Sequence, residues 1–88
     1  MNNFVRNMNF LSERFSILNP YEEIVTIKTN KNTYKINKEI DNVVFLLDVN
    51  KNKEYFFESN ELDELIVTLA GLFDRTNERV VDVFSYRS

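Results

Sequence analysis

The chain of 88 residues has no cysteine and no histidine, and it has only one glycine and one proline. Without cysteine, it can form neither a disulfide nor a thiolate zinc site, and it has no thiol nucleophile. Without histidine, it lacks the most common general base and metal ligand of proteins. One glycine is too few for the glycine-rich loops that cradle phosphate groups. We therefore expect no catalytic residue, no bound metal and no cofactor.

The sequence also lacks a long apolar stretch. The N-terminal segment is interrupted by polar residues between Arg6 and Arg14, so we expect neither a signal peptide nor a transmembrane helix. A short chain without disulfides suits a reducing compartment. We expect a cytoplasmic protein without a membrane partner, in a bacterium or in an infected host cell. The 13 asparagines accompany many residues with AT-rich codons, which is typical of a low-GC bacterium or one of its viruses.

The length and composition fit one globular domain over residues 1–88. Hydrophobic residues make up 43% of the chain and charged residues 28%, enough apolar surface for one modest core. The net charge of −3 is unevenly spread: residues 1–40 hold six basic and four acidic side chains, and residues 41–88 hold five and ten. The chain thus lacks the overall basic excess that is typical of nucleic-acid-binding proteins.

Two segments show the periodicity of amphipathic helices. In the first, 4–18, the apolar side chains recur every three or four residues until Asn19-Pro20 ends the helix. In the second, about 60–74, the apolar stripe is Leu62, Leu65, Ile66, Leu69, Leu72 and Phe73. Ser59 or Asn60 is expected to cap its start, and Asn77 to end it in a left-handed conformation. We interpret the helical Gly71 as a site of close packing.

The remaining segments are typical of strands. Residues 24–37 predict a hairpin with Asn30-Lys31-Asn32 at its tip, and 42–49 is apolar enough for a central strand covered on both faces. A turn at 50–53 leads to a strand at 54–59, and 79–87 is the last strand. The predicted fold class is α+β: order α-β-β-β-β-α-β, with a twisted antiparallel sheet and both helices packed on one face.

The string Asn-Lys-Asn occurs twice, at 30–32 and 50–52. In the second copy, Asp48, Asn50, Asn52 and Glu54 place oxygen atoms at alternate positions, as in the first half of a calcium loop. The sixth position is Lys53 instead of glycine, and the twelfth is Ser59 instead of glutamate. We therefore interpret both strings as hairpin turns in which asparagine adopts the positive φ angles that glycine usually provides.

Three surface features are candidates for binding. A lysine-rich hairpin with an aromatic residue could neutralise and stack on single-stranded nucleic acid; its residues are Lys28, Lys31, Tyr34, Lys35 and Lys38. An acidic run at the start of the second helix could face a basic groove on a partner; its residues are Glu58, Glu61, Asp63 and Glu64. Aromatic residues outside the expected core faces, with an arginine nearby, are typical interface anchors; these are Phe56, Tyr86 and Arg87. Helix capping and solvation explain many of these charges equally well.

From the sequence we expect a small protein-binding module without enzymatic activity, an inhibitor or accessory factor that occludes or tethers a macromolecular partner. A phage or mobile-element antagonist of a host defence enzyme is one form, and an immunity protein is another. Two alternatives stay open: a nucleic-acid-binding regulator that uses the hairpin 28–38, and a structural homodimer formed through the last strand or the first helix. The sequence does not distinguish which face binds.

Overall fold

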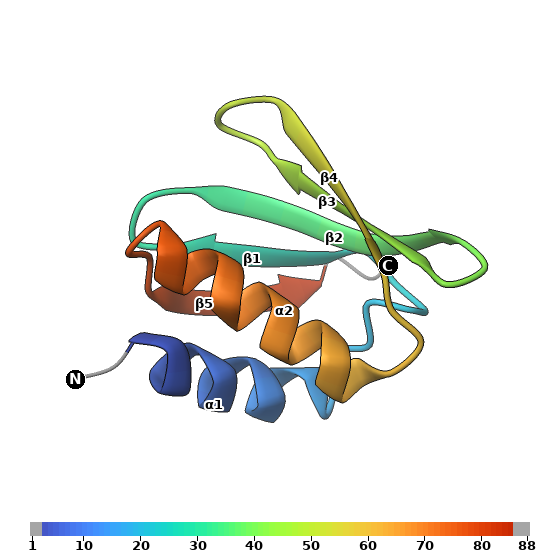
Figure 1. The fold of residues 1–88 in the computed structure, drawn as a ribbon, viewed down its shortest axis with the longest axis horizontal. Coiled ribbons are helices and arrows are strands. Elements are labelled where there is room, and N and C mark those ends of the chain that lie inside the picture. The colour runs from blue at the N-terminus through green and yellow to red at the C-terminus, as the bar shows by residue number, and fades with distance from the viewer. Residues whose placement is uncertain (1–2, 86–88) are drawn as a thin grey trace.

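Two helices and five strands follow each other in the predicted order. The computed structural model describes residues 3–85 and places both helices on one face of a five-stranded sheet (Figure 1). The elements are α1 (Asn3–Phe15), β1 (Val25–Thr29), β2 (Thr33–Ile40), β3 (Val43–Asp48), β4 (Lys53–Glu58), α2 (Leu62–Arg75) and β5 (Val80–Ser85). The predicted α+β class and the order α-β-β-β-β-α-β are confirmed.

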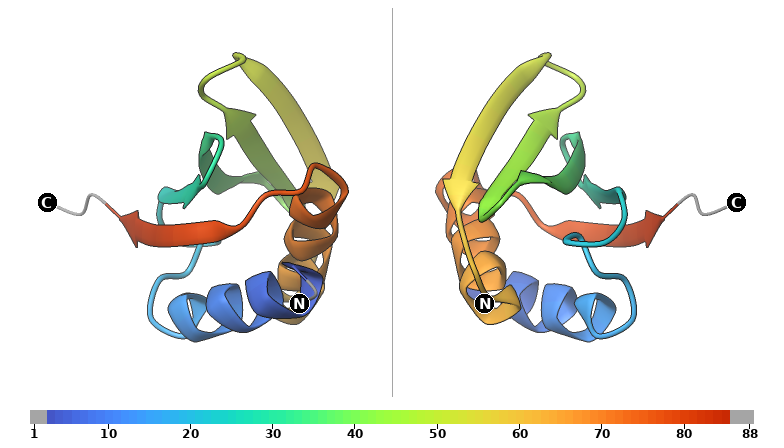
Figure 2. Two further views of the ribbon diagram at one scale, coloured as in Figure 1. Left: turned by 90° about the vertical axis from the view of Figure 1, so that its left-hand side faces the viewer. Right: turned by 90° about the vertical axis from the view of Figure 1, so that its right-hand side faces the viewer.

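The sheet has the strand order β4-β3-β2-β1-β5, and every neighbouring pair is antiparallel. Strands β1 to β4 form a meander because short turns connect them. Helix α2 then carries the chain across the sheet, so that β5 pairs with β1 at the opposite edge from β4 (Figure 1). The sheet is strongly twisted between these two edges, and the helices lie on the same side of it (Figure 2). Strands β4 and β5 are therefore the two edge strands of the sheet.

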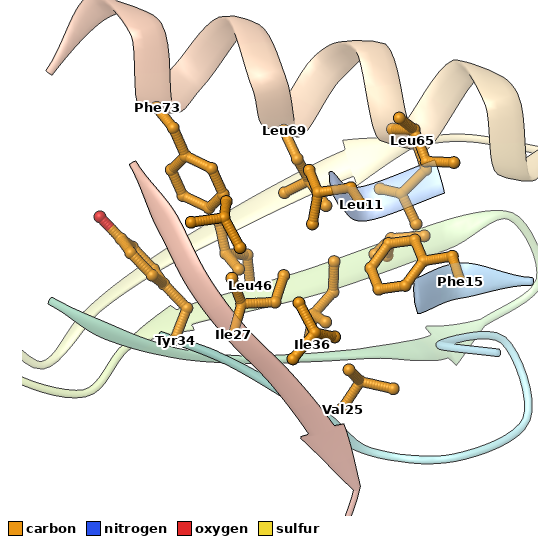
Figure 3. Packing of buried hydrophobic residues seen from close by; sticks show 14 residues of the cluster. Leu11, Phe15, Val25, Ile27, Tyr34, Ile36, Leu46, Leu65, Leu69 and Phe73 are labelled. Carbon is orange, nitrogen blue, oxygen red and sulfur yellow. The ribbon is translucent and has the colours of Figure 1, made fainter. Parts of the chain in front are cut away.

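The core lies between the helices and the inner face of the sheet (Figure 3). The period of two in the strands directs alternate side chains inward, and the period of 3.6 in each helix directs one stripe toward them. The fully buried apolar side chains are Leu11, Val25, Ile27, Ile36, Val44, Leu46, Leu65, Leu69, Ala70, Phe73, Val80 and Val83. Burial of each large one contributes roughly 1.5–3 kcal/mol before the loss of conformational entropy is counted.

Helix α2 ends as predicted but begins differently. Asn77 has a φ of 55°, its N–H donates to Asp74 O (3.1 Å), and the Glu78 N–H donates to Phe73 O (2.7 Å). This is the Schellman pattern that terminates helices. At the other end, Glu61 occupies the N-cap position without a side-chain capping bond, so the predicted capping by Ser59 or Asn60 is wrong. The Ser59 hydroxyl is instead within 2.8 Å of the Tyr21 hydroxyl.

Two further expectations about packing are wrong. The outer-face residues of β3, Val43, Phe45 and Leu47, are only half-buried, because both helices cover the other face. Gly71 is not required by close packing: a Cβ atom there would meet only the Arg75 Nη1 atom, at an ordinary contact distance of 3.7 Å. Continuous hydrophobicity in a short strand thus did not mean that both of its faces are covered by helices.

Candidate functional site

An exposed aromatic pair lies on the outer face of the sheet, opposite the helices. Phe45 of β3 and Phe56 of β4 are direct cross-strand partners, and their rings meet edge to face with centroids 5.0 Å apart. Such pairs contribute roughly 0.5–1.5 kcal/mol beyond the area they bury. Phe56 nevertheless leaves 61% of its surface exposed to solvent. Val43 and Leu47, next to Phe45 on the same face, extend this apolar surface.

The backbone of β4 is also open on its outer side. The Ser59 N–H donates to Asn42 O (2.8 Å). In an antiparallel pair, every second residue hydrogen-bonds to the neighbouring strand, so this bond shows which residues of β4 bond to β3. In this alternation, Tyr55 and Phe57 direct their backbone groups toward β3. The N–H and C=O groups of Glu54, Phe56 and Glu58 point away from the sheet, and no side chain among residues 3–85 hydrogen-bonds to them.

Two acidic side chains flank Phe56 on this outer face. Glu54 and Glu58 are two residues before and after it, so all three project to the same side of β4. Beyond Glu58, the chain turns into α2, where Glu58 and Glu64 line one shallow depression together with Asn42, Ser59 and Asn60. From the predicted set, Phe56 and Glu58 therefore share the outer face of β4, to which the structure adds Glu54 and Phe45, whereas Glu64 is brought beside Glu58 alone.

The other predicted partner-binding residues lie elsewhere. Asp63 lines a separate depression between α1 and α2 with Met8 and Val67. Glu61 contributes its carbonyl oxygen to the Tyr21 hydroxyl (3.1 Å). Tyr86 and Arg87 lie outside the residues that the structure describes. The acidic run 58–64 is therefore divided between two sides of the molecule because the helix turns its residues in different directions.

The lysine-rich hairpin is divided in the same way. Lys28 and Lys35 are exposed on the outer face of β1 and β2, whereas the Lys31 ammonium group donates to Thr76 O (3.1 Å) at the end of α2. The exposed Lys38 lies near the far end of β2, where its backbone N–H donates to Pro20 O (3.0 Å). Tyr34 is 3% exposed and faces the core, where its ring packs against Phe73 with centroids 5.0 Å apart. It is therefore not available to stack on a base, which corrects that part of the nucleic-acid hypothesis.

A buried carboxylate, which sequence reasoning missed, explains the position of Tyr34. Glu78 is 1% exposed, and among residues 3–85 the hydrogen-bond donors to its carboxylate are hydroxyl and amide groups. The Tyr34 hydroxyl donates to it at 2.8 Å and the Asn32 amide at 3.1 Å, and the hydroxyls of Thr29 and Thr76 complete the set. These donors come from three separate segments, the hairpin tip, β2 and the end of α2, so no local motif announces the cluster.

The donors also set the protonation of this cluster. Burial alone raises the pKa of Glu78, but the hydrogen bonds from Thr29, Thr76, Tyr34 and Asn32 outweigh it and hold that pKa below its ordinary value of 4.5. Burial, followed by the hydrogen bond to the Glu78 carboxylate, raises the pKa of Tyr34 far above its ordinary value of 10.0. Because Glu78 is inaccessible to a substrate, we interpret the cluster as a clamp that ties the first hairpin tip to the end of α2.

The two Asn-Lys-Asn strings form turns by different means. In the first, no residue has a positive φ; instead the Asn30 Oδ1 atom accepts from the Arg79 N–H (2.8 Å). In the second, Asn52 does adopt a positive φ of 53°. Both strings are turns as predicted, but the prediction of a positive φ holds only for the second one.

The calcium-like pattern of the second string has a different role. The Asp48 Oδ1 atom accepts from the backbone N–H groups of Asn50 (3.1 Å) and Lys51 (3.2 Å), which stabilises the turn. No three acidic side chains within the described part of the chain are grouped as metal ligands.

Comparison of the chain with protein-family models, with curated proteins and with solved structures found no match. Neither helix in the described part is long and apolar enough to cross a membrane. What the chain does must therefore be inferred from its own surface.

Proposed function

We propose that this chain is a non-enzymatic protein-binding module that acts as an inhibitor or accessory factor by occluding or tethering a protein partner. The observation that carries the proposal is Phe56, a large aromatic side chain that is 61% exposed. It projects from an uncovered sheet face beside Phe45 and between two carboxylates. Aromatic residues surrounded by polar ones are typical of the centres of protein interfaces. A phage or mobile-element antagonist of a host enzyme, or an immunity protein, would have this form.

The distribution of charge favours a protein partner with a basic rim. Glu54 and Glu58 flank Phe56 on the outer face, so the surface beside the aromatic residue is acidic, and Glu64 extends this acidic region beyond Glu58. A nucleic acid would be repelled from this region by its phosphates. The basic side chains Lys28 and Lys35 lie on the same face but over β1 and β2, and the aromatic residue that was expected to accompany them is buried.

A pair of surface substitutions tests the proposal. Phe56→Ser removes the exposed aromatic group, and Val67→Ser is a matched control because Val67 is 49% exposed on α2. Both variants should keep the free energy of unfolding within about 1 kcal/mol of wild type, since neither side chain is buried. With each variant used as bait in an extract of the organism that encodes the chain, quantitative mass spectrometry should identify a protein that wild type and Val67→Ser retain. Phe56→Ser should retain about tenfold less of it.

Three results would contradict the proposal. One is a partner that binds Phe56→Ser as well as it binds wild type, because the outer face would then not be the binding surface. Another is wild-type protein that is dimeric by light scattering and becomes monomeric on Phe56→Ser substitution, because a second copy of the chain would then occupy this face. Enzymatic turnover by the purified chain alone would also refute the non-enzymatic role.

A further inference from the structure

The open edge of β4 carries an inference that rests on the proposed function and makes it more specific. We propose that β4 binds an extended segment of its protein partner as a sixth, antiparallel strand, and that this segment carries an apolar residue flanked at the second position on each side by lysine or arginine. Strand addition of this kind takes its affinity from backbone hydrogen bonds and its specificity from alternate side chains.

The two sheet edges differ in whether side chains hydrogen-bond to their outward backbone groups. On β5, side chains satisfy outward backbone groups of Val80 and Val83: Arg14 donates to Val83 O at 2.7 Å, Arg6 donates to Val80 O at 3.1 Å, and the Asp82 carboxylate accepts from the Val83 N–H at 2.9 Å. On β4, the outward N–H and C=O groups of Glu54, Phe56 and Glu58 have no such partner among residues 3–85. Unpaired edge groups of this kind are a ready template for another strand.

The side-chain pattern on β4 determines which residues an added strand should carry. In an antiparallel pair, directly opposite residues lie on the same face of the sheet. A residue opposite Phe56 would therefore contact its ring, and residues two positions away on either side would face Glu54 and Glu58. Opposite charges there stabilise the pair and like charges destabilise it. The added strand should thus present basic, apolar and basic side chains at alternate positions.

The same pattern disfavours a second copy of this chain in the corresponding register. A two-fold pairing of β4 with itself that places Phe56 opposite Phe56 also places Glu54 opposite Glu58, twice. These like charges would repel each other directly. The negative charges of Glu54 and Glu58 therefore disfavour self-association of this edge and favour a basic segment.

Amide hydrogen exchange of the free protein is the first test. We expect the amides of Glu54, Phe56 and Glu58 to exchange rapidly and those of Tyr55 and Phe57 to be protected by β3. Protection of all five amides in a dimeric free protein would show that another copy already occupies the edge, and it would overturn the proposal.

Synthetic peptides are the second test. The probe is Ser-Thr-Lys-Thr-Phe-Thr-Lys-Thr-Ser, together with versions that carry isoleucine or valine in place of phenylalanine. On binding, exchange of the Glu54, Phe56 and Glu58 amides should slow by about tenfold or more, because each becomes hydrogen-bonded. The amide of Thr26 should not change, because Thr26 is in β1 and is separated from β4 by two strands. Absence of binding by all three peptides at millimolar concentration would overturn the proposal.

Modified peptides and variants then separate backbone pairing from simple charge attraction. N-methylation at the phenylalanine and both lysines of the peptide should abolish binding, and N-methylation at the intervening threonines should not, since only the former amides face β4. Glu54→Lys combined with Glu58→Lys should weaken binding by about tenfold at low ionic strength. The matched pair Glu61→Lys and Asp63→Lys should leave it unchanged.

The outcomes distinguish this inference from the proposed function. Peptide binding without slower exchange at Glu54, Phe56 and Glu58 refutes strand addition but leaves the outer face as a protein-binding surface. Equal weakening by both N-methylated peptides refutes the antiparallel pairing. Retention of a native partner by wild type and its loss from Phe56→Ser, with no peptide binding, would support the proposed function and overturn strand addition at β4.

Discussion

The two edges of the sheet differ in how their backbone groups are satisfied. At β5, two arginines of α1 donate to the Val83 and Val80 carbonyl groups, and the strand's own Asp82 accepts from the Val83 N–H. At β4, no side chain of residues 3–85 hydrogen-bonds to the outward groups of Glu54, Phe56 and Glu58, and charged side chains such as Glu54 and Glu58 discourage unwanted pairing. Because an exposed edge promotes aggregation, the open β4 edge supports the proposal that this strand binds a partner.

The closed edge is also the better anchored end of the molecule. The Asn7 amide of α1 donates to Glu78 O (2.8 Å), and its Oδ1 atom accepts from the Val80 N–H (2.9 Å). The Glu78 carboxylate, just before β5, joins the first hairpin tip to the end of α2. Stability should therefore depend strongly on polar residues near β5, which the following substitutions test in order of decreasing effect.

The largest effect is expected from Asn7→Ala. Asn7 is fully buried, so its removal would leave the Glu78 carbonyl and the Val80 N–H without partners inside the protein. Two buried groups that lose their hydrogen bonds cost about 3 kcal/mol together, which urea denaturation would measure. Asn9→Ala, on the exposed side of the same helix, is the control and should change the free energy of unfolding by less than about 0.5 kcal/mol. Equal effects of the two variants would contradict the anchoring role.

Glu78→Gln should have the next largest effect and should alter the dependence of stability on pH. At neutral pH we expect a loss of about 2 kcal/mol, because the amide group cannot accept all the hydrogen bonds that the carboxylate accepts. The pKa of Glu78 is lower in the folded protein than its ordinary value of 4.5. Its contribution is therefore complete above that value and is lost as the pH falls through the lower, folded value.

Urea denaturation at a series of pH values checks this expectation. The free energy of unfolding of the wild type should fall as the pH drops below about 4.5, and the fall should be smaller in Glu78→Gln. Glu61→Gln, at the surface start of α2, serves as the control and should follow the wild-type profile. A steeper fall in Glu78→Gln than in the wild type would mean that folding raises the pKa of Glu78, and it would refute the stabilised carboxylate.

The smallest of the three effects is expected from Arg14→Met. This change keeps the apolar stem but removes the two donors to Val83 O, so unfolding should become easier by about 1 kcal/mol. It should also open the β5 edge, so that light scattering at high concentration detects self-association that the wild type does not show. Arg75→Met, at the end of α2, is the control. Unchanged stability and an unchanged scattering mass in Arg14→Met would mean that the arginine does not protect this edge.

Periodicity in the sequence was enough to predict the elements and most of the core. The stripe from Leu62 to Phe73 defined α2 because a helix can bury only one face. Asn77 was predicted as a helix terminator because few residues tolerate a left-handed conformation. These features depend on neighbours three or four residues away at most, and such local preferences are visible in a single sequence.

The candidate site was predicted only in part. Phe56 and Glu58 were chosen from the sequence and share the outer face of β4, and Glu64 lies beside Glu58, but Phe45 and Glu54 were missed. Tyr34 was assigned to the wrong side because its burial depends on Glu78, which is 44 residues away. Polar clusters of this kind leave no periodic signal, since each member comes from a different segment and is stabilised only when all of them meet.

The sequence by itself determined the helices, the strands and their order, because hydrophobic period and turn residues act over a few positions. Only the tertiary structure decided which sheet face stays open, which edge is covered by arginines and which carboxylates surround Phe56. The physical reason is that the solvent exposure of a residue depends on which distant segments of the chain pack against it after folding.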